Sequence, residues 1–408
     1  MSFDGIVIGG GPAGMLAAIT ASQQGQRVLL IERNNRLGKK LLITGKGRCN
    51  VTNDCTSEEV LRNIPRNGRF LYSAMEKYPP ARIMEYLEKI GCPLKTERGN
   101  RVFPVSDRSV SVLECLEREL RRCSVQVQEG RVSEILTDEQ GVSGVRVQGE
   151  RIPSKWVILA TGGLSYPATG STGDGYRMAQ ELGHTVTDRQ GSLVPLEIAG
   201  QDCPAMQGLS LRNVGVRLLD AKGKLLYKDF GELLFTHFGV SGPTVLSASA
   251  HLKGEHCSLV LDLKPALDEG KLNDRILRDL EQYRNRVMEN ALTDLLPRSM
   301  IPVVLSRLEV PTDLQANSFT KQQRRMLVSL LKNFSLPITG RRPVEEAIIT
   351  SGGIKVSEID PKTMESKLVS GLFFAGEIID CDAYTGGFNL QIAWATAHAA
   401  GMAVKNCD

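Results

Sequence analysis

The sequence predicts an α/β protein with a central parallel sheet, and three glycine-rich stretches are the basis of this prediction. Each stretch places glycines directly after a short apolar run, as in DGIVIGGGPAG (4–14), WVILATGG (156–163) and GLFFAGE (371–377). Short apolar runs of this kind are typical of strands buried in a parallel sheet. Small residues at the carboxyl ends of such strands leave room for a ligand outside the sheet edge.

The first stretch has the pattern of a dinucleotide-binding unit. IVI reads as a strand, MLAAITASQQG as a helix and VLLIE as a second strand that ends on Glu32. The spacing Gly9-x-Gly11-x-x-Gly14 matches the fingerprint in which glycines permit a tight turn, close approach to a pyrophosphate and helix–strand packing. We expect the helix N-terminus to face the phosphates and the Glu32 carboxylate to face the ribose hydroxyls.

The other two stretches predict further parts of the same site. Ala160-Thr161-Gly162 ends a strand, and the following YPATGSTGDGYRMAQELG reads as a glycine-rich loop that opens a helix. Gly376-Glu377 ends a later strand, and TGGFN then precedes a C-terminal helix. A basic stretch at 33–53, RNNRLGKKLLITGKGRCNVTN, directly follows Glu32. Its position favours a loop that folds over a phosphate-bearing cofactor.

Length and composition limit the function classes. A chain of 408 residues predicts two or three domains. The 50 Lys and Arg nearly balance the 46 Asp and Glu, so neither a nucleic acid nor a membrane surface is expected as a partner. The nine cysteines lack paired spacing, which favours a reducing, cytoplasmic location. No apolar run reaches the about 18 residues of a membrane span.

The combined stretches resemble the two-dinucleotide-binding-domain flavoproteins and, more closely, the BaiN/aminoacetone-oxidase-like family of NAD(P)/FAD-dependent oxidoreductases. GKGRCNVTN and TGGFNLQIAW are the most specific matches. The resemblance implies bound FAD and three structural parts. These are a discontinuous Rossmann-like FAD-binding domain (1–190 and 350–408), an inserted β-barrel-like domain (191–264 and 336–349) and a helical subdomain (265–335). We expect the FAD to be non-covalent, because the sequence has no visible attachment signal.

The resemblance also assigns residues to the cofactor. Val132 matches a position near the adenine, Glu377 one near the ribityl chain, and Asn389 and Leu390 match positions that face the flavin ring. The complete expected cofactor set is Gly9, Gly11, Pro12, Ala13, Gly14, Glu32, Arg33, Lys39, Lys40, Thr44, Gly47, Arg48, Cys49, Asn50, Val132, Ala160, Thr161, Gly162, Gly376, Glu377, Gly387, Phe388, Asn389 and Leu390.

A catalytic side chain is harder to assign, because the flavin itself performs the redox chemistry. His237, Tyr166 and Tyr384 are the candidates, with Asp382 as a further possible substrate contact; no metal ligands are expected. Dithiol flavoenzymes place two cysteines with four residues between them. Here five residues separate Cys49 from Cys55, which favours Cys49 as a buried packing residue.

The leading prediction is an FAD-dependent oxidoreductase that uses NAD(P)H to reduce an activated C=C bond in a small organic substrate. No second G-x-G-x-x-G follows a strand after Gly14, so NAD(P)H would bind only transiently, at the flavin. For the same reason an amine oxidase that releases peroxide stays open as an alternative. An FAD-binding redox sensor or scaffold is the alternative from another class. The sequence does not indicate the oligomeric state.

Overall fold

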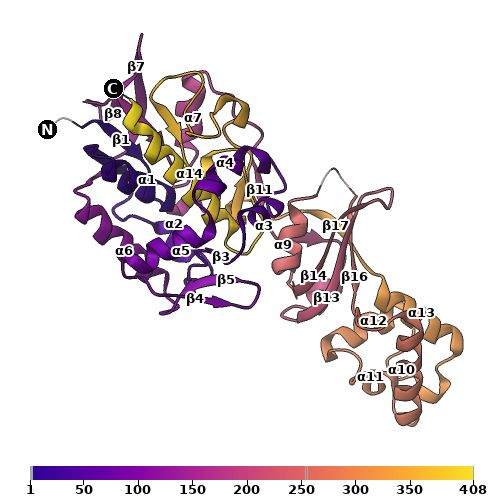
Figure 1. Ribbon diagram of the computed structural model, residues 1–408. Helices are drawn as coiled ribbons and strands as arrows, with labels where there is room; N and C mark the ends of the chain where they lie inside the picture. Colours follow the sequence, from indigo (N-terminus) through magenta and orange to yellow (C-terminus); the bar gives the residue numbers. More distant parts are fainter. Residues whose placement is uncertain (1–2, 253, 255, 408) are drawn as a thin grey trace. The chain divides into compact units, whose positions relative to one another are not determined.

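The chain forms two compact units in the computed structural model, which describes residues 3–252, 254 and 256–407 (Figure 1). Unit 1 comprises Met1–Ser192 and Val344–Asp408, and unit 2 comprises Leu193–Pro343. Unit 1 is therefore discontinuous in sequence, as is the predicted FAD-binding domain.

A five-stranded parallel sheet forms the centre of unit 1. Its strand order is β19 (Leu372–Phe374), β10 (Trp156–Leu159), β1 (Gly5–Ile8), β2 (Val28–Glu32) and β6 (Gln126–Glu129). All residues of the first four strands are buried, whereas the edge strand β6 is largely exposed. The predicted α/β fold with a central parallel sheet is confirmed, and the predicted apolar runs form its strands.

Helices α1 (Pro12–Gln23) and α14 (Phe388–Ala403) pack against each other in unit 1. Every α1 residue from Ala13 to Ala21 is buried, as expected for a helix that is apolar on all sides. The approach is close, since a Cβ on Gly401 would lie 2.7 Å from the Thr20 side chain. The N-terminal and C-terminal segments therefore share one core.

Shorter elements surround this centre. The helices are α2 (Lys39–Ile43), α3 (Ser57–Arg62), α4 (Tyr72–Lys77), α5 (Pro80–Lys89), α6 (Ser109–Arg122) and α7 (Asp174–Glu181). Unit 1 also has three small antiparallel sheets among its described residues. The first has the strand order β3 (Thr52–Asn53), β5 (Arg101–Pro104) and β4 (Leu94–Glu97), and the second has the order β7 (Val132–Asp138), β8 (Gly141–Val147) and β9 (Glu150–Pro153). The third consists of β11 (Gln190–Ser192) and β18 (Ile349–Ser351).

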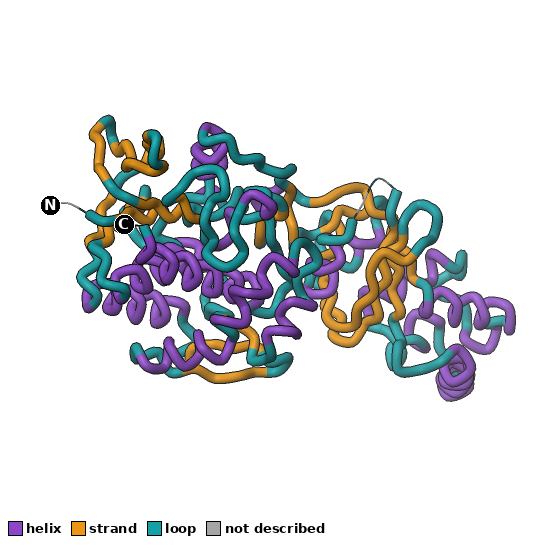
Figure 2. Tube along the Cα trace, turned by 45° about the horizontal axis from the view of Figure 1, so that its top comes forward, coloured by secondary structure: helices purple, strands orange, loops and turns teal. Residues whose placement is uncertain are grey.

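Unit 2 contains a closed six-stranded barrel, which confirms the predicted barrel-like insertion. Its strand order is β12 (Leu196–Ile198), β15 (Gly239–Ser241), β14 (Leu225–Phe235), β13 (Ser210–Leu219), β16 (Ser258–Asp262) and β17 (Phe334–Arg341). Its helices are α8 (Asp202–Ala205), α9 (Pro243–Ser249), α10 (Glu269–Gln282), α11 (Met288–Ala291), α12 (Ile301–Arg307) and α13 (Lys321–Lys332). Figure 2 shows most of these helices grouped beside the barrel strands.

Two details of unit 2 differ from the expected domain division. The helices at 265–335 share one hydrophobic core with the barrel, which includes Ile276 and Leu327 from helices together with Leu261 and Phe334 from strands. At the return of the chain, β18 pairs with β11. This pairing keeps residues 344–349, which were expected in the insertion, within unit 1.

None of the described helices is both long enough and apolar enough to cross a bilayer.

Candidate functional site

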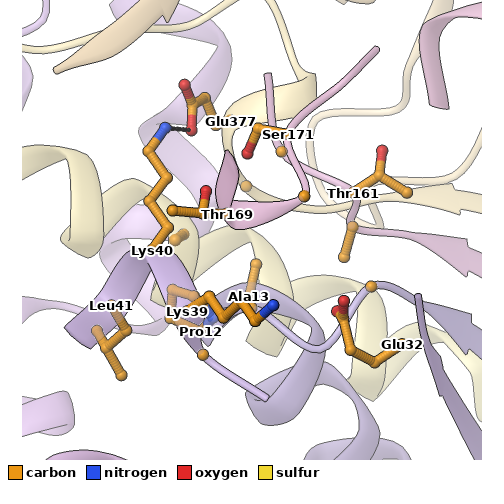
Figure 3. A pocket seen from close by; sticks show the side chains of 18 of the residues that line it. Pro12, Ala13, Glu32, Lys39, Lys40, Leu41, Thr161, Thr169, Ser171 and Glu377 are labelled. Atoms are coloured by element: carbon orange, nitrogen blue, oxygen red, sulfur yellow. Dashed lines mark hydrogen bonds and ion pairs between the residues drawn. The ribbon is translucent and has the colours of Figure 1, made fainter. Parts of the chain in front are cut away.

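A large pocket lies in unit 1, at the carboxyl ends of the parallel strands (Figure 3). Its volume is about 1280 Å³ when the space at its open mouth is included. Ends of all four buried strands contribute to it, through Ile8, Ile31, Ala160 and Ala375. The expected cofactor residues that line it are Gly9, Gly11, Pro12, Ala13, Glu32, Arg33, Lys39, Lys40, Thr44, Val132, Ala160, Thr161, Gly162, Gly376, Glu377, Asn389 and Leu390.

The three fingerprint glycines have different physical roles. Gly9 has φ +107°, and a Cβ on Gly14 would lie 1.8 Å from the Gly9 carbonyl oxygen. Glycine is therefore required at both positions for reasons within the protein itself. At position 9 the backbone is left-handed, and at position 14 the Gly9 carbonyl leaves no room for a side chain. A Cβ on Gly11 would have no atom within 4 Å, yet Gly11 lines the pocket and precedes α1 without a side-chain cap. Its missing side chain leaves space that a ligand at the helix N-terminus can use.

Glu32 is held rigidly at the end of β2. Its side chain is only 9% exposed. One carboxylate oxygen accepts a hydrogen bond from the Gly10 N–H at 2.7 Å, and the other accepts from the backbone and side-chain nitrogens of Asn34 at 2.8 and 2.6 Å. The oxygen that faces Asn34 already accepts two hydrogen bonds, whereas the oxygen that faces Gly10 accepts one and can accept another from a ligand hydroxyl group.

Lys40 and Glu377 form an ion pair in the pocket wall, 2.6 Å apart (Figure 3). Lys40 also donates to the Ser165 hydroxyl at 2.7 Å, and the second Glu377 oxygen accepts from Ser165 at 3.0 Å and from the Thr350 N–H at 2.9 Å. One carboxylate thus connects α2, the loop after β10, and β18.

Thr161 provides a test of whether the site suits a polar ligand. Its hydroxyl oxygen is buried and has no hydrogen-bond partner among the described residues, although the residue lines the pocket. An unsatisfied buried hydroxyl is costly. This oxygen is closed off from the pocket and lies beside Gly175, so the fit to a nucleotide cofactor depends instead on the open side of Gly11 and on the Glu32 carboxylate.

Comparison with known proteins identifies the family. The profile of the HI0933-like protein Rossmann domain matches residues 3–403. The chain belongs to the HI0933-like family. It is 31% identical over 405 residues to 3-dehydro-bile acid delta(4,6)-reductase from Clostridium scindens, covering 97% of this chain and 98% of the relative.

Further comparisons support the same placement. Ribosomal RNA dihydrouridine synthase from Escherichia coli is 29% identical over 403 residues, covering 97% of this chain and 96% of that relative. The structure of 3-ketosteroid delta1-dehydrogenase from Sterolibacterium denitrificans matches all of both chains with TM-score 0.55 and 14% identity, which shows a common fold. Family membership confirms the prediction of a flavoprotein oxidoreductase. The expectation that nucleic acid is not a partner stays untested, because one full-length relative is named for ribosomal RNA.

Several residues of this HI0933-like chain that were expected at the cofactor do not line the pocket. Gly14, Gly47, Arg48, Cys49, Asn50, Gly387 and Phe388 are outside its lining. Arg48 instead pairs with Glu97 and Asp107 and lies over the Phe103 ring at 4.2 Å. A Cβ on Gly387 would lie 2.4 Å from the Thr52 backbone, so that glycine serves helix packing.

The candidate catalytic residues also lie outside the lining. His237 is exposed between β14 and β15 in unit 2, and Tyr166 and Tyr384 occupy loops of unit 1. Asp382 is 2% exposed and accepts hydrogen bonds from Ser192 and Ser351. Burial raises the pKa of Asp382. The catalytic acid of this protein therefore stays unassigned.

Cys49 and Cys55 are both free thiols. Cys49 is fully buried, and burial raises the pKa of its thiol. Burial also raises the pKa of Cys55 to about 11. Among the described residues no cationic side chain donates to either sulfur, so nothing offsets the effect of burial, and both environments disfavour the thiolate that attacks in dithiol chemistry.

Sequence analysis missed other lining residues. They are Asn34, Gly38, Leu41, Gly130, Thr169, Gly170, Ser171, Thr172, Asp174, Met178, Ile348, Ile349 and Ala393, with the strand ends Ile8, Ile31 and Ala375. The glycine-rich stretch at 166–183 was a usable signal for six of them. Ile349 begins the stretch ITSGGIKVSEIDPKTMESK, and Ile348 directly precedes it; this stretch contributes to the family resemblance but has no pattern that indicates a pocket.

Proposed function

We propose that this HI0933-like protein binds FAD non-covalently in the unit 1 pocket and uses NAD(P)H to reduce a carbon–carbon double bond conjugated to a carbonyl group. The observation that carries the proposal is one pocket that combines the open Gly11 turn, the fixed Glu32 carboxylate and the start of α14. Bound FAD supplies the hydride chemistry.

The pocket residues suggest how the cofactor would be held. Glu32 and Val132 would bind the adenosine end, and Gly11 and Ala13 the pyrophosphate. Asn389 would lie at the ring end. Its side chain donates to the Ala383 carbonyl at 2.7 Å and accepts from the Ala383 N–H at 2.8 Å. These paired bonds fix the first turn of α14, whose positive end stabilises negative charge on a nearby ring.

The reaction class is supported by the names of two full-length relatives. A delta(4,6)-reductase and a dihydrouridine synthase both denote addition of hydrogen to a ring C=C bond. Hydride addition requires a double bond polarised by an electron-withdrawing group, hence the conjugated carbonyl. A small alicyclic or steroid-like enone is the first substrate candidate.

A pyrimidine base in RNA is the second substrate candidate, and the charge distribution favours it. Unit 2 contains 20 of the 50 Lys and Arg but only 16 of the 46 Asp and Glu, so the whole net charge of +4 belongs to unit 2. The β13–β14 hairpin exposes Lys222, Lys224, Lys228 and the aromatic ring of Phe230. Cations interleaved with an exposed aromatic ring suit a nucleic acid strand.

Anaerobic reduction tests the proposal. The purified protein is mixed with NADH and then NADPH, and the visible flavin absorbance is followed. We expect bleaching, and then recovery on addition of an enone, or of ribosomal RNA transcribed without modification. Bleaching that no C=C acceptor reverses would contradict the proposed reaction. Reduction by amines alone, with peroxide formed in air, would replace it with the oxidase alternative; no reduction by any donor would favour the sensor.

A further inference from the structure

A second, smaller cavity in unit 1 is lined by two cysteines and one arginine. Cys92 lies between α5 and β4, Cys115 lies in α6, and Arg118 lies one helical turn after Cys115. None of the three lines the cofactor pocket. The function proposed above does not use them.

The Cys115 sulfur has polar partners on two sides. The Arg118 guanidinium donates a hydrogen bond to the Cys115 sulfur at 3.0 Å. The S–H of Cys115 donates to the Gly91 carbonyl oxygen at 3.3 Å. A guanidinium donor at this distance stabilises negative charge that develops on sulfur during nucleophilic attack. Cys115 is only 4% exposed, but it lines the cavity and has this cationic donor, so it is the better placed of the two thiols to attack a small oxidant.

Cys92 has the surroundings of a resolving thiol. Burial, and then the adjacent Cys115 thiol, raise the pKa of Cys92 to about 12. Cys92 lines the same cavity as Cys115, and the Cys115 sulfur lies 3.3 Å from the carbonyl oxygen of Gly91, the residue before Cys92. Cys92 therefore lies where its thiol can meet an oxidised Cys115, and its raised pKa makes it the slower of the two thiols to attack peroxide.

We propose that Cys115 and Cys92 form a site of reversible oxidation by hydrogen peroxide. The Cys115 sulfur attacks peroxide, the O–O bond breaks, and Cys115 sulfenic acid and one water form. The Cys92 sulfur then attacks this sulfenic sulfur, its thiol proton leaves with the hydroxyl group as a second water, and the Cys92–Cys115 disulfide results. In total, one peroxide is reduced and two thiols are oxidised.

The location connects this site to the cofactor pocket. On α6, the Ser109 hydroxyl donates to the Leu42 carbonyl at 2.8 Å, and a Cβ on Gly38 would lie 2.8 Å from Leu113. The disulfide would therefore join the turn after α5 to the helix that packs against the Gly38–Leu42 segment.

Peptide mapping tests the proposal. The reduced full-length protein is treated with hydrogen peroxide, blocked at its remaining thiols and digested without reductant. We expect a Cys92–Cys115 peptide pair that dithiothreitol separates. Cys92→Ser should instead accumulate a dimedone adduct on Cys115, and Cys115→Ser should give neither product. Arg118→Gln should slow the reaction, whereas the matched control Cys203→Ser should react like wild type.

Several results would overturn it. One is a Cys49–Cys92 link, and another is loss of thiols in Cys115→Ser at the wild-type rate. The proposal would also be overturned if both thiols stayed reduced in excess peroxide. Cys115→Ala is measured in parallel, and thermal melting of each variant shows whether it is folded.

Discussion

Lys40 and Glu377 are 337 positions apart in the chain, yet the lysine ammonium lies 2.6 Å from a glutamate oxygen in the wall of the unit 1 pocket. Both side chains are partly shielded from water, with 23% and 12% exposure. The attraction between two charges is stronger in such surroundings than at an exposed site, but the two groups also lose more hydration when the protein folds.

A double-mutant cycle should measure this pair. We expect Lys40→Met and Glu377→Gln to be coupled by about 1–2 kcal/mol in the free energy of urea unfolding of the cofactor-free protein. The exposed pair Arg62–Glu58, at 66% and 75% exposure, is the matched control and should show about 0.5 kcal/mol or less. Equal coupling in the two cycles would mean that the pocket pair has no special role.

Gly11 and Gly14 should respond differently to alanine. Gly14→Ala places a methyl group on the Gly9 carbonyl, so we expect loss of folding or a large drop in melting temperature. Gly11→Ala meets no protein atom and has φ −75°, so it should fold normally but bind FAD at least about tenfold more weakly. Melting of the cofactor-free protein and titration with FAD measure the two effects. Undiminished FAD affinity in Gly11→Ala would place the pyrophosphate elsewhere.

Local pattern was sufficient for the first βαβ unit and for the glycines that line the pocket. There Gly9 and Gly11, which belong to the predicted turn, also line the unit 1 pocket. The stretch GKGRCNVTN shows the limit of this reasoning. Gly45, Lys46, Gly47 and Cys49 all have positive φ, so the chain reverses tightly, and Thr44 lines the pocket while Arg48 points to Glu97.

Long-range partners could not be predicted for a related reason. Nothing near Glu377 in the sequence indicates Lys40, and nothing near Ile348 indicates a pocket, because these contacts depend on how distant segments pack. The boundary between the two units depends on another long-range contact, the pairing of β11 with β18, whose residues are far apart in the sequence.

Replacement of Glu32 should weaken cofactor binding. Glu32→Ala removes one hydrogen bond between a charged group and the ribose, which contributes about 1.5–3 kcal/mol, so we expect a Kd for FAD that is about ten- to a hundredfold higher. The control is Glu129→Gln, because Glu129 is the exposed neighbour of Glu32 on β6 and does not line the pocket. Fluorescence titration measures both. A variant at Glu32 with wild-type affinity would contradict its proposed role at the ribose.

Stability at acidic pH should depend on His398. Its ring stacks on Tyr78 with 4.3 Å between ring centroids. Burial, with the nearby charges of Lys77 and Arg82, lowers the pKa of His398 from 6.5 to about 4.

As the pH falls from 6.5 towards about 4, the unfolded chain takes up a proton at this histidine that the folded protein does not. The free energy of unfolding must therefore decrease through this window and level off below it. His398→Phe keeps a stacked ring but has no proton to bind, so its stability should fall less steeply over the same range. Urea unfolding at several pH values measures the two slopes. Acidic groups and His184, whose pKa is also lowered by burial, are present in both proteins and cancel in the comparison. Identical slopes would show that His398 does not contribute to the acid sensitivity of the fold.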